Sequence, residues 1–212
     1  MAKSILYLLR HGESQGNVAR VFDARKLDSP LTAVGHAQIQ SAARLLSGID
    51  FAAVHTSPLE RARVTAEAVC RPHNRTPVVT DDLLEVDVGG LDAASWEDPD
   101  AARSFWGVLA RWENGDAGAA FPGGESLDDV QRRFQSLLAS LEGPPGARFL
   151  AVGHGLLIAA VLWSLCPNHA DAVGDLFMDG ACLAVVEMDG GTGRLHAHNI
   201  APDTPAGSIH LP

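Results

Sequence analysis

The chain alternates short apolar runs with polar, glycine-rich breaks, and several runs have the length of a buried strand. Two of them, Ile5–Leu9 and Arg148–Val152, stop abruptly where a histidine follows. The last two runs flank a turn that contains three glycines, which predicts a β-hairpin. The predicted strands are Ile5–Leu9, Ala52–His55, Pro77–Val79, Arg148–Val152, Leu183–Met188 and Leu195–Ile200.

Segments with helical start and stop signals lie between these strands. The strongest start is Ser57-Pro58-Leu59-Glu60, with a serine N-cap, proline at the first helical position and glutamate at the third. The predicted helices run from Thr32 to about Leu46, from Ser57 to about Cys70, from Ser126 to Leu141 and from Gly155 to Cys166. This alternation predicts an α/β fold, a three-layer sandwich in which helices cover both faces of a mostly parallel sheet.

The segment 92–124 departs from the alternation. It is helical in pattern and contains Trp96, Trp106 and Trp112, three of the four tryptophans. We predict that it is a small helical insertion over one edge of the sheet. The whole chain, 1–212, is expected to form one domain, since its length suits a single core.

The aromatic residues of this insertion leave two interpretations open. They line a lid over a substrate, or they dock the helix on the core. The spacing of Phe105, Leu109 and Trp112 is typical of an amphipathic helix and agrees with the second interpretation.

Composition limits the classes of function. The net charge is −10 and no run is rich in lysine or arginine, which excludes a typical nucleic-acid partner. Cys70, Cys166 and Cys182 are far apart, which predicts no disulfide framework and a reducing cytoplasm. The N-terminal apolar run is too short for a signal peptide. The longest apolar stretch, Gly155 to Leu165, is about half of the ~20 residues that a membrane span needs, so we expect a soluble protein without a membrane partner.

Two histidines next to glycine are the first candidates for chemistry. His11 and His154 each follow a predicted strand, and ligands of open α/β sheets bind outside the carboxyl ends of the strands. We therefore expect both imidazoles in one crevice, although each alone is compatible with an ordinary loop position. Arg10 precedes His11, and Arg61 lies in the first turn of a predicted helix, where an anion is favoured. Arg61 is equally compatible with a surface pair to a neighbouring glutamate.

These residues belong to an ordered set of motifs. The motifs are Leu9-Arg10-His11-Gly12-Glu13-Ser14 with Asn17, Asp28-Ser29-Pro30-Leu31-Thr32 with Gly35 and Gln38, Ser57-Pro58-Leu59-Glu60-Arg61-Ala62 with Thr65-Ala66, Glu85 with Gly89, Pro122-Gly123-Gly124-Glu125-Ser126, and Val152-Gly153-His154-Gly155. In this order the chain resembles the histidine phosphatase superfamily, also called phosphoglycerate-mutase-like, from about Leu6 to Asn199.

The resemblance implies a role for each site residue. His11 would attack phosphorus as a neutral imidazole and form a phosphohistidine that water then hydrolyses. Glu85 would protonate the leaving alkoxide and later activate water, although spacing alone does not separate it from Asp87. The residues implied to bind the phosphoryl group or the substrate are Arg10, Asn17, Asp23, Arg61, His154 and Gly155. No metal or cofactor is expected, because side chains supply the positive charge.

One position departs from the family pattern. Asp23-Ala24 stands where many relatives carry Gln-Gly or Thr-Gly, and a carboxylate there would repel a second anionic group on the substrate. We hypothesise that Asp23 either faces away from the pocket or meets an amine or hydroxyl of the substrate.

The resemblance favours a phosphatase of a small phosphorylated metabolite. The cover 92–124 is shorter than the corresponding stretch of the family's mutases, and an open site favours hydrolysis over transfer. A phosphoglycerate mutase-type phosphotransferase and a non-catalytic phosphoryl-binding regulatory protein are the alternatives. A homodimer formed through a sheet edge is also open. His196 and His198 share one face of a predicted strand, but without a further ligand we expect no metal site there.

Overall fold

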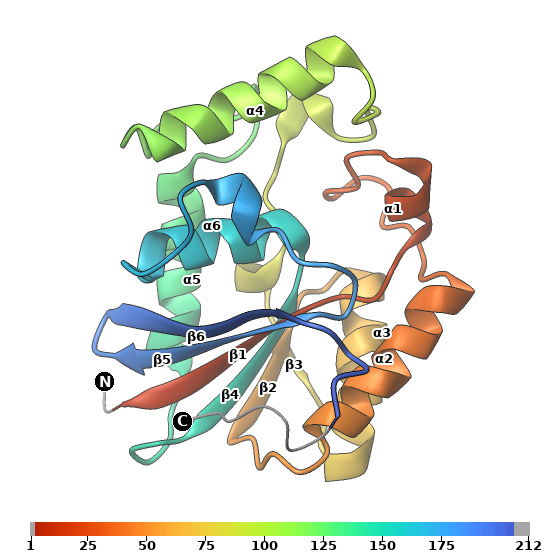
Figure 1. Cartoon of the computed structure of the whole chain (residues 1–212), viewed down its shortest axis with the longest axis vertical. Coiled ribbons are helices and arrows are strands. Elements are labelled where there is room, and N and C mark those ends of the chain that lie inside the picture. Colours follow the sequence, from red (N-terminus) through yellow and green to blue (C-terminus); the bar gives the residue numbers. More distant parts are fainter. Residues whose placement is uncertain (1–2, 206–212) are drawn as a thin grey trace.

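The computed structural model describes residues 3–205 and contains one six-stranded sheet in the order β3-β2-β4-β1-β5-β6 (Figure 1). The strands are β1 (Ser4–Arg10), β2 (Ala53–Thr56), β3 (Val78–Val79), β4 (Arg148–Gly153), β5 (Leu183–Asp189) and β6 (Thr192–Ile200). β4 pairs in parallel with both β1 and β2, and β2 pairs in parallel with β3. β5 is antiparallel to β1 and to β6. The prediction of a mostly parallel sheet is confirmed.

The centre of the sheet brings the two histidine loops together. β1 and β4 are buried along almost their whole length, which explains their continuous apolar sequences. Their register pairs Leu9 with Val152 and Arg10 with Gly153. The two strands therefore end at the same position in the sheet. His11 and His154, which follow them, lie side by side at the carboxyl edge.

Helices cover both faces of the sheet, as predicted (Figure 1). The α-helices are α1 (Gln15–Ala19), α2 (Ala33–Leu46), α3 (Glu60–Cys70), α4 (Pro99–Glu113), α5 (Leu127–Ser140) and α6 (Gly155–Leu165). Short 3-10 helices are η1 (Arg71–His73), η2 (Asp81–Leu83), η3 (Gly89–Leu91) and η4 (Val173–Leu176). The apolar faces of α2 and α3 form one core cluster with one face of the sheet, and those of α5 and α6 form another with the opposite face.

Two of the helices whose starts the sequence predicts have side-chain caps. The Thr32 hydroxyl accepts the amide of Gly35, and Ser126 forms a capping box with Asp129. The prediction of a cap at Ser57 is wrong, because α3 begins at Glu60 and its N-cap, Leu59, makes no side-chain cap bond. The Ser57 hydroxyl instead contacts a histidine of the candidate site.

The insertion contains α4, which lies above α6 and away from the sheet (Figure 1). Phe105 and Trp112 are buried in the core cluster beneath it, and the Trp112 indole donates to the carbonyl of Ala119 at 2.7 Å. Trp96 and Trp106 remain 40% and 52% exposed. Phe105 and Trp112 therefore dock the helix on the core, as the second interpretation predicts, and Trp96 and Trp106 line a cavity.

Two further observations concern chemistry away from the centre. Nε2 of His196 lies 2.9 Å from a Glu187 carboxylate oxygen, and Nε2 of His198 lies 3.0 Å from the carbonyl of Leu176. Within residues 3–205 no group of three or more histidine, cysteine, aspartate or glutamate side chains is arranged to hold a metal ion. None of the described helices has both the length and the apolar character needed to cross a membrane.

Candidate active site

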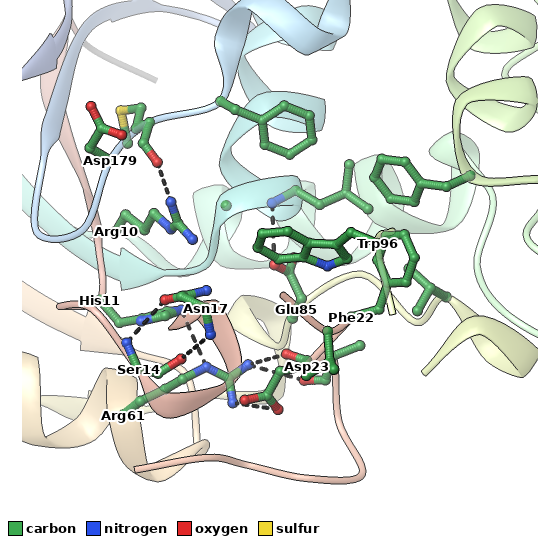
Figure 2. A pocket seen from close by; sticks show the side chains of 18 of the residues that line it. Arg10, His11, Ser14, Asn17, Phe22, Asp23, Arg61, Glu85, Trp96 and Asp179 are labelled. Atoms are coloured by element: carbon green, nitrogen blue, oxygen red, sulfur yellow. Dashed lines mark hydrogen bonds and ion pairs between the residues drawn. The ribbon is translucent and has the colours of Figure 1, made fainter. Parts of the chain in front are cut away.

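A cavity of about 370 Å³ opens at the carboxyl ends of β1 and β4 (Figure 2). The predicted site residues that line it are Arg10, His11, Asn17, Asp23, Arg61, Glu85 and Gly155. The remaining one, His154, is fully buried, and its ring centroid lies 5.2 Å from that of His11. The structure thus gathers all the residues that the motifs indicate around one point.

His11 is a neutral imidazole whose Nε2 carries a lone pair. Its Nδ1 lies 2.7 Å from the carbonyl oxygen of Gly12, which can only accept, so Nδ1 carries the hydrogen. Nε2 then has a lone pair, which accepts the Nε–H of Arg61 at 3.2 Å. Burial, followed by the charges of Arg61 and Arg10, holds the pKa of His11 well below its usual range. The imidazole is therefore neutral near pH 7.

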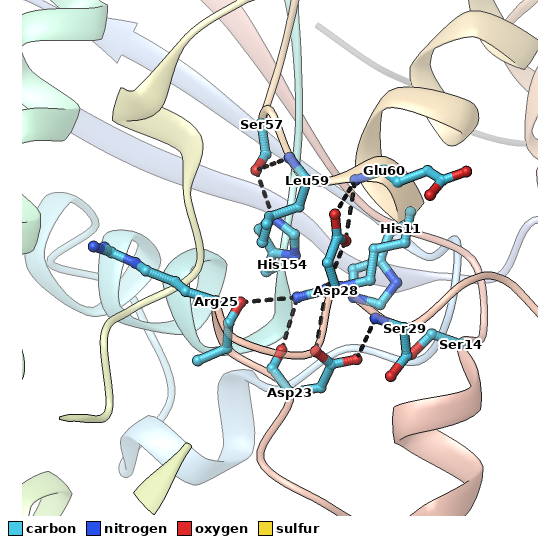
Figure 3. Close-up of polar contacts among 12 residues, drawn as sticks. His11, Ser14, Asp23, Arg25, Asp28, Ser29, Ser57, Leu59, Glu60 and His154 are labelled. Atoms are coloured by element: carbon cyan, nitrogen blue, oxygen red, sulfur yellow. Dashed lines mark hydrogen bonds and ion pairs between the residues drawn. The ribbon is translucent and has the colours of Figure 1, made fainter. Parts of the chain in front are cut away.

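His154 faces the site with an unpartnered nitrogen. Its Nε2 lies 2.8 Å from the Ser57 hydroxyl, and that hydroxyl oxygen also accepts the amide of Leu59 at 3.3 Å (Figure 3). When Ser57 donates its own hydrogen to Nε2, the ring hydrogen of His154 is on Nδ1. Nδ1 is buried and has no hydrogen-bond partner.

The Nε atom of Arg10 is also buried without a partner. One end of this guanidinium donates to the carbonyl of Met178, which fixes the side chain beside His11. An unsatisfied buried polar group costs about 1–3 kcal/mol. Two such unpartnered nitrogen atoms, on Arg10 and His154, lie on residues that adjoin His11, and donors of this kind can bind an anion.

Arg61 is 1% exposed, so the predicted alternative of a surface pair with a neighbouring glutamate is wrong. Its Nη1 lies 3.4 Å from an Asp23 carboxylate oxygen and 3.2 Å from one of Asp28. Its Nη2 donates to the carbonyls of Asp23 and Ala24 at 2.7 and 3.2 Å. With the bond to His11, all five N–H groups have acceptors. These bonds hold the guanidinium rigidly, with its Nε–H directed at Nε2 of His11.

The carboxylate of Asp23 serves the protein. One oxygen pairs with Arg61 and the other accepts the amide of Ser29 at 3.1 Å (Figure 3). The side chain is only 4% exposed. Asp23 is among the residues that line the cavity, while both of its carboxylate oxygens are bonded within the protein.

Glu85 lies at the N-terminus of α6, at the wall of the cavity. One carboxylate oxygen accepts the amides of Val86 and Leu157, both at 2.8 Å, and the other accepts that of Leu156 at 3.2 Å. Asp87, which spacing left as an alternative, does not line the cavity, and its carboxylate accepts the amide of Gly89. Glu85 thus lines the cavity, and its carboxylate is held there by three backbone amides.

A partly buried ion network fixes the segment that carries Glu85. Arg25 donates to the carbonyl of Glu85 at 3.0 Å and to the carboxylate of Glu125 at 2.8 Å. Arg133 donates to the other oxygen of Glu125 at 2.9 Å. This arrangement explains why the motif Pro122–Ser126 belongs with the site although Glu125 does not line the cavity.

Asn17 completes the inner part of the cavity. Its side-chain oxygen accepts the amide of Ser14 at 3.0 Å, and the Ser14 hydroxyl accepts the amide of Asn17 at 3.3 Å. The Asn17 side chain keeps its NH2 group, which is a donor, free for a ligand.

Sequence reasoning assigned no site role to several residues that the structure brings here. Ser57 orients His154 and Asp28 pairs with Arg61, while Phe22 and Phe177 line the outer cavity. Both polar residues stood within the quoted motifs, which was the available signal. No pattern in the sequence marked the two phenylalanines.

A family model described as histidine phosphatase superfamily (branch 1) matches residues 6–201. The chain belongs to the histidine phosphatase superfamily. Among its relatives is the probable phosphoglycerate mutase GpmB of Yersinia enterocolitica, 32% identical over 169 residues, which are 78% of this chain and 77% of that protein.

Solved structures with the same fold carry phosphatase names. The mycobacterial glucosyl-3-phosphoglycerate phosphatase, in complex with VO3, is 26% identical with a TM-score of 0.78, covering 95% of this chain and 100% of that one. The alpha-ribazole phosphatase from Shigella flexneri is 24% identical with a TM-score of 0.71, covering 92% of this chain and 96% of that one, which shows the shared fold alone. Relatives therefore include both mutases and phosphatases by name.

Proposed function

We propose that the protein is a metal-independent phosphomonoesterase that hydrolyses a small phosphorylated metabolite through a phosphohistidine at His11. One observation carries the proposal. The neutral nucleophile, with its lone pair on Nε2, is flanked by two buried donors without partners, on Arg10 and His154. A phosphoryl group would satisfy both donors while its phosphorus meets Nε2.

In the first half of the reaction, Nε2 of His11 forms a bond to phosphorus as the bond from phosphorus to the ester oxygen breaks. Glu85 donates a proton to that oxygen, and the alcohol leaves. The Nε–H of Arg61 loses its acceptor once Nε2 is phosphorylated, so it becomes available to a phosphoryl oxygen. Arg61 would thereby stabilise the group at the moment of transfer.

In the second half, a water molecule attacks phosphorus opposite Nε2. Glu85, now ionised, accepts a proton from that water, the phosphorus–nitrogen bond breaks, and phosphate leaves. Arg10 and Arg61 supply the positive charge that a metal provides in other phosphatases. The cycle returns His11 and Glu85 to their starting protonation states.

A mutase-type phosphotransferase is the second candidate, since a relative 32% identical is named a probable phosphoglycerate mutase. Transfer requires the phosphohistidine to outlive the departure of the first alcohol, and the site to bind a second phosphoglycerate. The phosphohistidine forms on His11 in either reaction. The two candidate functions therefore differ in what the rest of the cavity binds.

The test is phosphate release from a panel of phosphomonoesters in the presence of EDTA, for the wild type and for His11→Ala. The proposal expects turnover that survives EDTA and is lost in the variant. Loss of turnover in EDTA would overturn metal independence. Phosphate transfer from 2,3-bisphosphoglycerate to 3-phosphoglycerate without net release would favour the mutase, and binding of esters without either reaction would favour a regulatory protein.

A further inference from the structure

The outer half of the cavity is a cluster of aromatic rings. Phe22, Trp96, Phe105, Trp106 and Phe177 line it, and α4 or the segment just before it provides three of them (Figure 2). The rings form a connected set. The Phe22 centroid lies 4.9 Å from that of Phe105 and 6.3 Å from that of Trp96, and the Trp106 centroid lies 6.2 Å from that of Phe177.

This aromatic cluster is only partly used by the fold. Phe105 is 7% exposed and packs into the core, whereas Trp96 and Trp106 keep 40% and 52% of their surface exposed. Large rings that stay open at the mouth of a cavity offer a ligand apolar contact and edge-to-face or stacked packing. They favour a leaving alcohol that carries an apolar or aromatic group.

The distribution of charge in the cavity also favours an alcohol without a second anionic group. Of the described residues that line it, the basic ones are Arg10 and Arg61, and both lie at the phosphoryl end. All five N–H groups of Arg61 have partners, and Arg10 flanks the nucleophile. The acidic lining residues are Asp23, Glu85 and Asp179.

Three arginines on the surrounding segments pair with carboxylates, and the exposed Lys26 donates to the carbonyl of Gly89 at 3.3 Å. Arg20 pairs with Glu97 at 2.7 Å, and Arg25 pairs with Glu125. Arg103, on α4, pairs with the exposed Asp100. A carboxylate or second phosphate on the substrate would therefore lie among aromatic rings and carboxylates, and burying an unpaired charge is costly.

We propose that the substrates of this site are phosphate monoesters of apolar, preferably aromatic, alcohols that carry no second anionic group. This inference rests on the phosphatase activity proposed above and narrows it. It separates this chain from enzymes that act on phosphoglycerates, whose carboxylate needs a cation beside the phosphoryl site. The names of the relatives do not decide the matter, because glucosyl-3-phosphoglycerate and alpha-ribazole differ in chemistry.

The test compares esters whose alcohols have similar acidity, so that differences report recognition and not leaving-group chemistry. Benzyl phosphate should exceed ethyl phosphate in kcat/KM by about tenfold or more, since a buried ring contributes well over one methylene's worth of binding. 4-Carboxybenzyl phosphate should be at least about tenfold poorer than benzyl phosphate because its carboxylate finds no cation. A comparison of glycerol 3-phosphate with 3-phosphoglycerate repeats the test for the effect of a carboxylate on a smaller alcohol.

Two variants of Trp106 locate the effect in the aromatic cluster. Trp106→Ala should reduce the benzyl-to-ethyl ratio severalfold, and Trp106→Arg should raise the ratio of 4-carboxybenzyl to benzyl phosphate about tenfold by adding the missing cation. Arg103→Ala is the matched control, because it lies on the same helix with an exposed side chain that does not line the cavity. Its ratios should equal those of the wild type.

Each outcome decides one of the two proposals. Turnover of carboxylated and uncarboxylated esters at equal rates would overturn the substrate class and leave the phosphatase intact. If no ester is hydrolysed, the phosphatase proposal fails, and the substrate class is then decided by binding of benzylphosphonate, ethylphosphonate and 4-carboxybenzylphosphonate. Equal dissociation constants for these three would overturn the substrate class independently of turnover.

Discussion

The floor and the cover of the cavity are built on different principles. The floor, formed by His11, Arg61 and His154, is at most 3% exposed and held by polar contacts of defined geometry. The cover, formed by Trp96 and Trp106, is about half exposed, and its rings contact Phe22 and Phe105. Buried polar networks tolerate little change because each lost partner leaves an unsatisfied group. Substitutions of exposed apolar residues at the mouth of a cavity are better tolerated and affect mainly the part of the ligand that they contact.

We therefore expect the residues of the floor to carry out the reaction and the residues of the cover to select the alcohol of the substrate. Changes in the floor should affect all esters by similar factors, or according to leaving-group chemistry. Changes in the cover should affect esters according to the shape and charge of the alcohol.

The largest effect is expected for His11→Ala, which removes the nucleophile. Turnover of every ester should fall by at least about 10⁴-fold, since loss of an attacking side chain has effects of that order or larger. Phosphate release under saturating substrate measures it, and circular dichroism checks the fold. Residual activity above a few per cent of the wild type would show that another group attacks phosphorus.

Glu85→Gln should have the next largest effect, and one that depends on the leaving group. For benzyl phosphate, kcat should fall about 10²- to 10⁴-fold, because the alkoxide then leaves unprotonated. For 4-nitrophenyl phosphate the formation of the phosphohistidine should be much less affected, since nitrophenolate leaves without a proton. A burst of nitrophenol measured by stopped flow separates the steps, and an equal loss for both esters would contradict a proton-donating role.

Asp23→Asn tests whether that carboxylate serves the protein or the substrate. It disturbs the pairing with Arg61 and the bond from Ser29, so kcat/KM should fall about tenfold for all esters, with a loss of about 1–3 kcal/mol in the free energy of unfolding. The ratio of 2-aminoethyl phosphate to ethyl phosphate should not change. A selective loss of the amino ester would show instead that Asp23 binds an amine.

The smallest predicted effect is on stability as a function of pH. Burial, then the charge of Arg61, lowers the pKa of both His11 and His154 in the folded protein. The unfolded chain therefore binds more protons below pH ~6.5, so this contribution is complete above that pH and is lost as the pH falls. Each histidine can contribute up to about 1.4 kcal/mol per pH unit in that range.

Urea denaturation at pH 7.5, 6.0 and 5.0 measures this effect. The free energy of unfolding of His11→Ala should decline less between pH 6.0 and 5.0 than that of the wild type. Equal declines would mean that His11 has an ordinary pKa in the folded protein.

The fold and the floor could be predicted from the sequence because local signals and tertiary structure agree there. The buried strands β1 and β4 are continuous apolar runs, and the residues that follow them must meet at the carboxyl edge. Glu85 and Asp87 could be separated only through the family motif, because which of the two faces the cavity depends on the loop backbone.

Other features depend on contacts that no local pattern encodes. Ser57 has every local signal of a helix cap, yet its hydroxyl bonds to His154, 97 positions away along the chain. Arg61 could not be told from a surface arginine because the carboxylates that bury it, Asp23 and Asp28, come from a distant loop. Phe22 and Phe177 come together only through the packing of α4, so the aromatic cluster was not predictable as a unit.

The most direct test of the central claim is to trap the intermediate at His11. The wild type is mixed with a limiting amount of benzyl phosphate, quenched in base within milliseconds to seconds, digested, and analysed by mass spectrometry under conditions that preserve phosphohistidine. Phosphate on the peptide that contains His11, appearing before free phosphate and absent from His11→Ala, is the predicted result. Release of free phosphate with no phosphorylated peptide at any time, or phosphate carried by another residue, would contradict the account.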